Sequence, residues 1–229
     1  MTFLFHDTVP VATGTVSVAF TGRRLDLGDL APDDVRAAGL AEIAAATGAT
    51  PYLMRQVHGT TVHVVHGDRS GVVPEADALV TDRPGVALLA RAADCVPVLL
   101  VGEDGAIGAV HAGREGVRRG VVAAAVERLR ELGATGLRAW VGPHICGRCY
   151  EVPAEMRAEV AAVVPATAAT TSWGTPSLDL GAGVLAELAD AGVAVVEVGG
   201  CTREDEAFHS YRRDGAAAGR LAGVVWRAA

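Results

Sequence analysis

His58, Cys95 and His111 are widely separated in the chain and carry side chains that can hold a catalytic metal ion. Two imidazoles and one thiolate form the donor set of a zinc ion with an open fourth position. Zinc bound in this way lowers the pKa of a coordinated water toward about 7, as the deamination of a purine requires. A cysteine can also serve as a small buried hydrophobe, and a histidine can simply be satisfied within a core. Spacing alone leaves both interpretations open.

A Cys-x-x-Cys pair, Cys146 and Cys149, is the second group of candidate residues. A structural zinc site usually needs a second pair of this kind, and the sequence shows none. A thioredoxin-like site needs a helix N-terminus directly after a strand, which Gly142-Pro143 only half supplies. We therefore expect packing or support of a neighbouring site for this pair, rather than zinc binding or redox chemistry.

Phosphate chemistry would require an anion site, for which the chain offers arginine alone. The 20 residues counted as Lys+Arg include no lysine, which excludes a lysine nucleophile or Schiff base. The planar guanidinium suits bidentate phosphate binding. The candidates, with Asp214 as a residue that could orient one of them, are Arg23, Arg212, Arg213 and Arg220. Their alternative role is that of ordinary solvated arginines at a turn.

Three other functions use the same residues. Cys95 and His111 could form the nucleophile pair of a cysteine hydrolase or amidase acting on cell-wall precursors. A copper polyphenol oxidase would need a weak axial methionine beside two histidines and a cysteine, and none of Met1, Met54 and Met156 has that setting. We therefore consider copper less suitable than zinc. A metal-stabilised binding protein that works through partners is the non-enzymatic alternative.

The elements around Cys95 and His111 follow from two apolar runs. Residues 96–101 and 106–110 predict two adjacent buried strands joined by an acidic turn at 102–105. Apolar residues then recur at three- and four-residue steps from Val117 to Leu132, which predicts a helix that ends at Gly133. His111 therefore stands where a buried strand leads into a helix, the sheet edge at which α/β proteins commonly bind ligands.

The remaining pattern mixes further strands and helices. His58 precedes a β-branched run, and its neighbour Gly59 allows close approach of the backbone to a ligand. A loop is expected at 165–171 and a short helix from about Ala216. Strands are predicted at 15–20, 61–65, 75–82, 137–141 and 193–198, and helices at about 33–46, 154–164 and 177–192. These elements indicate one α/β (α+β) domain over residues 1–229.

Composition narrows the class of protein. The 229 residues are 50% hydrophobic, enough for a well-covered core. The net charge of -7 argues against binding to nucleic acid or to a membrane surface. The start of the chain lacks the features of a secretory signal, and no apolar tract approaches the length of a transmembrane helix. We expect a cytoplasmic protein with reduced thiols.

Several motifs carry a resemblance to a known family. In order they are Gln56-Val57-His58-Gly59, Ala76-Asp77-Ala78-Leu79-Val80-Thr81, Ala93-Asp94-Cys95-Val96-Pro97, Val110-His111-Ala112-Gly113, Val141-Gly142-Pro143 with Cys149-Tyr150-Glu151-Val152, Leu178-Asp179-Leu180, and Ser210-Tyr211-Arg212-Arg213-Asp214-Gly215 with Gly219-Arg220. This set resembles the YfiH family, also called laccase-domain, polyphenol oxidoreductase or peptidoglycan editing factor proteins. The resemblance runs from residue 56 to nearly the C-terminus.

The resemblance implies both a fold and a function. The fold would have two mixed sheets covered by helices, and the zinc ligands would be His58, Cys95 and His111. The activity would be purine nucleoside phosphorolysis of adenosine, inosine and methylthioadenosine, with adenosine deamination as a second activity.

The sequence departs from the family in two places. The family usually continues its His-Ala-Gly motif with Trp-Arg-Gly, whereas this chain has Arg114-Glu115-Gly116, which puts in question any phosphate or base contact made there. The N-terminal loop is also compressed, and Arg23 is the counterpart of the family's arginine in a loose alignment.

Overall fold

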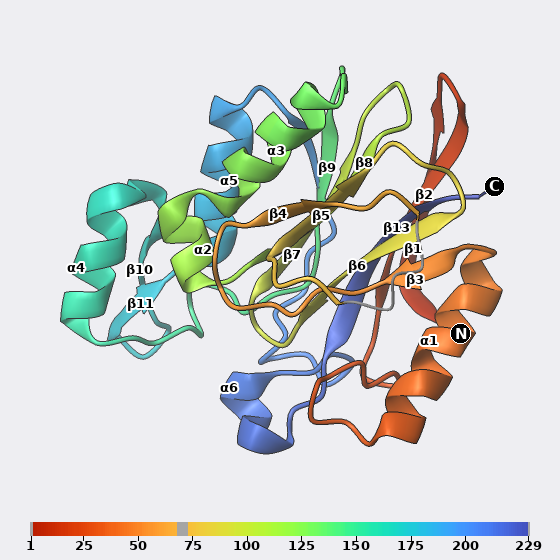
Figure 1. Cartoon of the computed structure of the whole chain (residues 1–229). Coiled ribbons are helices and arrows are strands. Elements are labelled where there is room, and N and C mark those ends of the chain that lie inside the picture. Colours follow the sequence, from red (N-terminus) through yellow and green to blue (C-terminus); the bar gives the residue numbers. More distant parts are fainter. Residues whose placement is uncertain (1, 68–72, 229) are drawn as a thin grey trace.

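Two large mixed sheets stack face to face in the computed structural model, which describes residues 2–67 and 73–228 (Figure 1). The first sheet has the strand order β1-β2-β13-β6-β3. Only β3 and β6 are parallel neighbours in it. Its strands are β1 (Phe3–Val11), β2 (Gly14–Thr21), β13 (Leu221–Arg227), β6 (Val86–Ala92) and β3 (Thr50–Tyr52).

The second sheet contains the strands around the candidate centre, in the order β12-β9-β7-β8-β5-β4. The outer pairs, β12 with β9 and β4 with β5, are parallel, and the inner pairs are antiparallel. Its strands are β12 (Ala194–Glu197), β9 (Arg138–Val141), β7 (Val96–Val101), β8 (Ile107–Ala112), β5 (Ala78–Thr81) and β4 (Val62–Val64). A small separate sheet pairs β10 (Ala168–Thr170) with β11 (Pro176–Leu178).

Helices cover the outer faces of both sheets. The apolar face of α3 (Val121–Glu131) packs on the second sheet beside α5 (Leu180–Asp190). Helix α4 (Ala154–Val163) contacts α2 (Arg114–Arg119) and the small β10–β11 sheet. On the first sheet, Ile43 of α1 (Asp33–Thr47) packs against Leu89 and Trp226. A third cluster fills the space between the sheets, where Phe20 meets Leu99. The predicted mixed α/β fold with two helix-covered sheets is confirmed.

Strands β6, β7 and β8 are buried along their whole length. Because both faces of each strand lie within protein, the sequence shows continuous apolar runs rather than alternation. Gly102 and Gly105 close the turn between β7 and β8, and Gly105 has a φ of 97°, which favours glycine. The two adjacent buried strands predicted here are confirmed.

Four predicted elements differ from the structure. The helix expected over 117–132 is two helices, α2 (Arg114–Arg119) and α3, because Gly120 adopts a left-handed φ of 80° between them. The expected loop at 165–171 contains a 3-10 turn and β10. Ser177 lies in β11, and α5 begins after Asp179, whose carboxylate accepts from Ala182 N–H at 2.9 Å.

The C-terminal segment shows the largest difference. A helix was expected from Ala216, whereas α6 (Tyr211–Asp214) and a 3-10 turn come first and residues 221–227 form β13. Strand β13 lies between β2 and β6 in the first sheet. Its residues are buried on both faces, so the apolar run lacks the alternation that would distinguish a strand from a helix.

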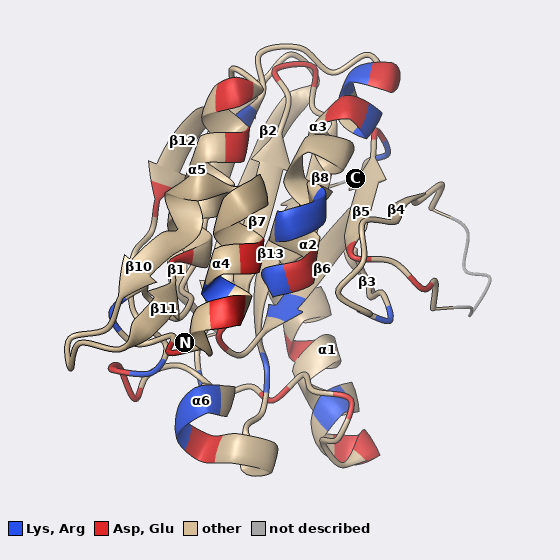
Figure 2. Ribbon diagram, turned by 90° about the vertical axis from the view of Figure 1, so that its left-hand side faces the viewer, with Lys and Arg blue, Asp and Glu red and all other residues tan. Residues whose placement is uncertain are grey.

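Charged residues lie mainly on helices and connections, while the central strands are mostly uncharged (Figure 2). Both signs alternate along α2, where Glu115 pairs with Arg114 and Arg118. Within residues 2–67 and 73–228, no helix is long and apolar enough to cross a membrane.

Candidate metal centre

Cys95 and His111 come together through the register of the β7–β8 hairpin. Cys95 directly precedes β7, and the pairs Val96 with Ala112 and Pro97 with His111 face each other across the two strands. The hairpin therefore places the thiol and the imidazole side by side. The ring of His111 is buried, whereas Cys95 is partly exposed.

Asp77 brings His58 to the hairpin. Its buried carboxylate accepts N–H hydrogen bonds from Val57 at 3.2 Å, His58 at 3.0 Å and Gly59 at 2.6 Å. The same carboxylate contacts Nδ1 of His111 at 2.8 Å. One buried charge therefore orients the ring of His111 and holds the backbone of His58, and Nε2 of His111 is left available to bind a metal.

The three side chains form one compact group. The ligand atoms of His58, Cys95 and His111 all lie within 4.8 Å of one another, and Sγ of Cys95 is 3.8 Å from Nε2 of His58. The imidazole rings meet edge to face at 4.9 Å. A Cβ on Gly113 would lie 2.5 Å from the His58 ring and 3.2 Å from the Cys95 sulfur, so only glycine fits there.

The electrostatics of the pair favour a thiolate. Burial by itself raises the pKa of the Cys95 thiol, but the charge of His111 and hydrogen bonds from His111 and His58 outweigh it and lower the pKa to about 6. Burial likewise lowers the pKa of His111, but the Cys95 thiolate and the hydrogen bond to Asp77 outweigh it and raise the pKa to about 9. Each residue therefore favours the charged form of the other, thiolate for Cys95 and imidazolium for His111.

The donor set fits a borderline-soft cation such as zinc. Two imidazoles and a thiolate converge while the second ring nitrogen of His111 is held by a carboxylate, which is the usual support for a histidine ligand. Met54 and Met156 pack in hydrophobic clusters, and neither lines the pocket over the centre, so neither supplies the axial ligand of a blue-copper set. Met1 lies outside the described residues.

A pocket of about 450 Å³ opens over the centre, within the size range of small-molecule sites. Its charged and aromatic lining comes from β6, α6 and the loops beside them. The lining residues are Asp29, Gln56, His58, Arg91, Ala92, Ala93, Asp94, Cys95, His111, Ile145, Tyr150, Leu180, Tyr211, Arg212 and Arg220.

Two of the four predicted phosphate-binding arginines line this pocket. Arg212 donates through Nη1 to the carbonyl of Glu151 at 2.7 Å, and its guanidinium stacks on Tyr150 at 4.9 Å. Arg220 donates through Nη1 to the carbonyls of Ala218 and Gly219. A guanidinium anchored through one nitrogen still has donors for an anion.

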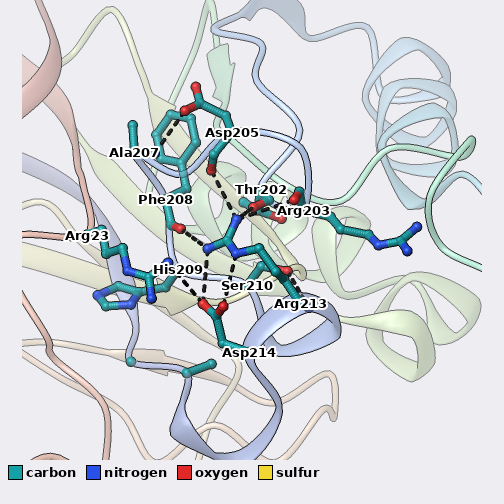
Figure 3. A network of polar contacts seen from close by, with 12 residues as sticks. Arg23, Thr202, Arg203, Asp205, Ala207, Phe208, His209, Ser210, Arg213 and Asp214 are labelled. Atoms are coloured by element: carbon teal, nitrogen blue, oxygen red, sulfur yellow. Dashed lines mark hydrogen bonds and ion pairs between the residues drawn. The ribbon is translucent and has the colours of Figure 1, made fainter.

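The other two arginines lie elsewhere (Figure 3). Arg213 donates to the carbonyls of Thr202 at 2.7 Å and Phe208 at 2.7 Å and contacts both oxygens of Asp214. Arg23 forms an ion pair with Asp214 at 3.1 Å. Neither lines the pocket, so the structure gives Arg213 a role in holding the loop before α6.

Residues 114 and 115, where the sequence departs from the family motif, also lie outside the pocket lining. The Glu115 carboxylate accepts from Nε and Nη2 of Arg118 at 3.0 and 2.9 Å and pairs with Arg114 at 3.2 Å. The charge of Glu115 is thus neutralised by two arginines of its own helix, α2.

Sequence reasoning assigned no role to three residues that shape the site. Asp77 orients the ring of His111 and holds the backbone around His58. Arg91 lies buried in the pocket wall, where it donates to the carbonyls of Leu27 and Met54. Asp94 has a left-handed φ of 90° and accepts from Thr202 Oγ1 at 2.7 Å and Arg212 N–H at 2.6 Å. Each is a charge within an apolar run, which is the signal that could have found them.

Comparison with known proteins finds a matching protein family and similar sequences. Residues 13–228 match the model of a family described as multi-copper polyphenol oxidoreductase laccase. A protein of Streptomyces griseus named purine nucleoside phosphorylase is 47% identical over 96% of this chain and 98% of its own length.

Solved structures with the same fold cover nearly the whole chain. A Neisseria meningitidis protein has a TM-score of 0.85 with 28% identity and covers all of both chains. The YfiH protein of Bacillus licheniformis has a TM-score of 0.82 with 24% identity, over 93% of this chain and 92% of its own. The resemblance to YfiH proteins is confirmed.

Proposed function

Since this chain belongs to the family described as multi-copper polyphenol oxidoreductase laccase, with relatives named purine nucleoside phosphorylase, we propose that it is a metal-dependent purine nucleoside phosphorylase. The observation that carries the proposal is a single pocket that joins the His58, Cys95 and His111 group to the cations Arg212 and Arg220. We propose adenosine, inosine and methylthioadenosine as substrates, with deamination of adenosine as a second activity in the cytoplasm.

Phosphorolysis replaces the N-glycosidic bond of a nucleoside with a bond from C1′ of the ribose to phosphate. Arg212 and Arg220 would hold the phosphate anion in the pocket, where guanidinium forks match its geometry. The rings of Tyr150 and Tyr211 would offer faces for the purine. Positioning the two reactants in one enclosed site supplies much of the acceleration such a reaction needs.

Zinc held by His58, Cys95 and His111 would supply Lewis-acid chemistry at the base of the pocket. Its binding requires a neutral His111, so the proton that Cys95 and Asp77 favour on that ring must leave. Asp77 then keeps the remaining proton on Nδ1 and directs Nε2 toward the thiolate.

The test is to incubate zinc-loaded protein with adenosine, with and without phosphate, and to separate the products by chromatography. We expect adenine and ribose 1-phosphate only when phosphate is present. Deamination should give inosine without phosphate, and inosine together with the hypoxanthine formed from it when phosphate is present. Cys95→Ala, which removes a proposed ligand, should abolish all of these products. Absence of turnover on adenosine, inosine and methylthioadenosine would overturn the proposal.

A cysteine hydrolase is the second candidate, favoured by the charged forms that Cys95 and His111 stabilise in each other. Asp77, His111 and Cys95 follow the order of a carboxylate, imidazole and thiolate triad. Such an enzyme would cleave an amide without metal, and a cell-wall precursor is the proposed substrate class. Amide cleavage that persists in the presence of a chelator would favour it over the phosphorylase.

A further inference from the structure

A second group of metal-ligating side chains lies apart from the pocket. The ligand atoms of Cys146, Cys149, Cys201 and Glu204 all lie within 4.8 Å of one another. None of the four lines the pocket over Cys95. The sequence pattern revealed no partner for the Cys146–Cys149 pair, because the other two residues, Cys201 and Glu204, come much later in the chain and one of them is a carboxylate.

The topology of the second sheet brings the two halves together. Strands β9 and β12 are parallel neighbours, so the segments that follow them leave the same edge of the sheet. A bridge between His144 and Cys201 continues the pairing beyond both strands. The backbone N–H of Cys146 points to the sulfur of Cys201 at 3.5 Å.

Each half has the same backbone turn. Cys149 N–H donates to the carbonyl of Cys146 at 2.9 Å, and Glu204 N–H donates to the carbonyl of Cys201 at 3.1 Å. In both cases the next residue's N–H donates to the same carbonyl, Tyr150 at 3.1 Å and Asp205 at 2.9 Å. These tight turns bring the first and fourth side chains of each half to one side, as Cys-x-x-Cys zinc turns require.

The four side chains match the requirements of one ion. All four cysteines of the chain are free thiols, and Sγ of Cys149 lies 3.3 Å from Oε1 of Glu204. Sulfur ligands about 2.3 Å from a tetrahedral zinc stand about 3.8 Å apart, which small rotamer changes would achieve here. Three soft sulfur donors select zinc over magnesium or calcium.

We propose that Cys146, Cys149, Cys201 and Glu204 bind a second, structural zinc ion. Four anionic donors exceed the charge of the ion, and two arginines offset the excess. Arg148 Nη2 lies 3.7 Å from Glu204, and Arg203 contacts the carbonyl of Cys149. Four protein ligands close the coordination shell, so this zinc holds structure rather than substrate.

The second zinc would fix the loop around Thr202, which supports the first centre, formed by His58, Cys95 and His111. Thr202, beside Cys201, donates its hydroxyl to Asp94 at 2.7 Å, and Asp94 directly precedes Cys95. The carbonyl of Thr202 accepts from Arg213 at 2.7 Å (Figure 3). The second zinc therefore holds Thr202, whose hydroxyl contacts Asp94, a residue with a strained left-handed backbone.

The test is the zinc content of the full chain, purified with reductant and measured by elemental analysis with protein quantified by amino-acid analysis. We expect about two zinc ions per wild-type chain and about one in Cys149→Ser and in Cys95→Ala. Glu204→Gln should release its second zinc to a chelator at least tenfold faster, whereas Glu206→Gln, an exposed neighbour, should match wild type. Zinc X-ray absorption of Cys95→Ala should show a sulfur-rich shell at about 2.3 Å.

A wild-type chain with one zinc, all of it lost in Cys95→Ala, overturns the proposal. So does a disulfide among Cys146, Cys149 and Cys201 in zinc-loaded, reduced protein, detected by peptide mapping. Since the wild-type stoichiometry and the absorption spectrum need no second-site variant, a folding failure of Cys149→Ser does not affect the decision. The outcome is independent of nucleoside turnover, which tests the proposed function separately.

Discussion

Replacing Asp77 by asparagine should destabilise the protein and weaken metal binding together. Oδ1 of Asp77 contacts His58 N–H and His111 Nδ1, and Oδ2 accepts from Val57 and Gly59 N–H groups. An amide has one oxygen, so in either orientation its NH₂ group faces donors that lose their acceptor. The change preserves side-chain volume and removes the charge.

The magnitude follows from the lost hydrogen bonds. A hydrogen bond to a charged group contributes about 1.5–3 kcal/mol, and a buried donor left without a partner costs about 1–3 kcal/mol. With Oδ1 retained, Val57 and Gly59 lose their acceptor. Because Val57 is 42% exposed and water can partly replace its acceptor, the expected loss in the free energy of unfolding is about 2–4 kcal/mol. Loss of a partner that orients a metal ligand typically lowers metal affinity by about 10–100-fold.

Urea unfolding and competition with a zinc chelator measure the two effects. The pH dependence gives a further readout. Burial alone raises the pKa of Asp77, but the donors from His111, Gly59 and Val57 outweigh it and lower the pKa. Its stabilisation is therefore present at neutral pH and lost as pH falls below about 4. A loss under about 1 kcal/mol with unchanged zinc affinity would refute this account of Asp77.

Three further predictions address the pocket. Gly113→Ala should reduce zinc affinity at least tenfold in the chelator assay, because the new Cβ meets the His58 ring at 2.5 Å; unchanged affinity would contradict that crowding. Arg212→Ala should raise the phosphate KM about tenfold or more with zinc content unchanged, and a variant that loses zinc instead would mark Arg212 as structural. Iodoacetamide should label Cys95 slowly in zinc-loaded protein and rapidly after chelation, as measured by peptide mapping. After chelation the pH dependence of labelling should give an apparent pKa of about 6 for the Cys95 thiol. Rapid labelling of the zinc-loaded protein would favour the hydrolase.

The sequence was sufficient where local pattern determines structure. The β7–β8 hairpin follows from two apolar runs around a glycine turn, and the start of α1 follows from Pro32 with two aspartates. The grouping of His58 with the other two residues is different, since it depends on Asp77 and on the pairing of β4 with β5. Contacts between distant segments leave no periodic trace, so the family resemblance supplied that expectation.

The features that the sequence did not reveal have different causes. Strand β13 is central and fully buried, so its residues show neither the alternation of a half-exposed strand nor a helical period. Arg213 looked like an anion-binding residue because a guanidinium that binds carbonyls and one that binds phosphate have the same sequence signal. The Cys146 pair looked solitary because its partner turn follows a different strand.

The β7–β8 hairpin also orders the steps by which the first centre assembles. Cys95 and His111 meet as neighbours on one hairpin, a unit that forms within about 1–10 μs in isolated peptides. His58 is synthesised before either of them, yet it reaches them only after β4 and β5 join the sheet and Asp77 collects the loop. A nascent chain would therefore offer a metal two ligands early and the third late, so tight binding would begin only when the sheet is complete.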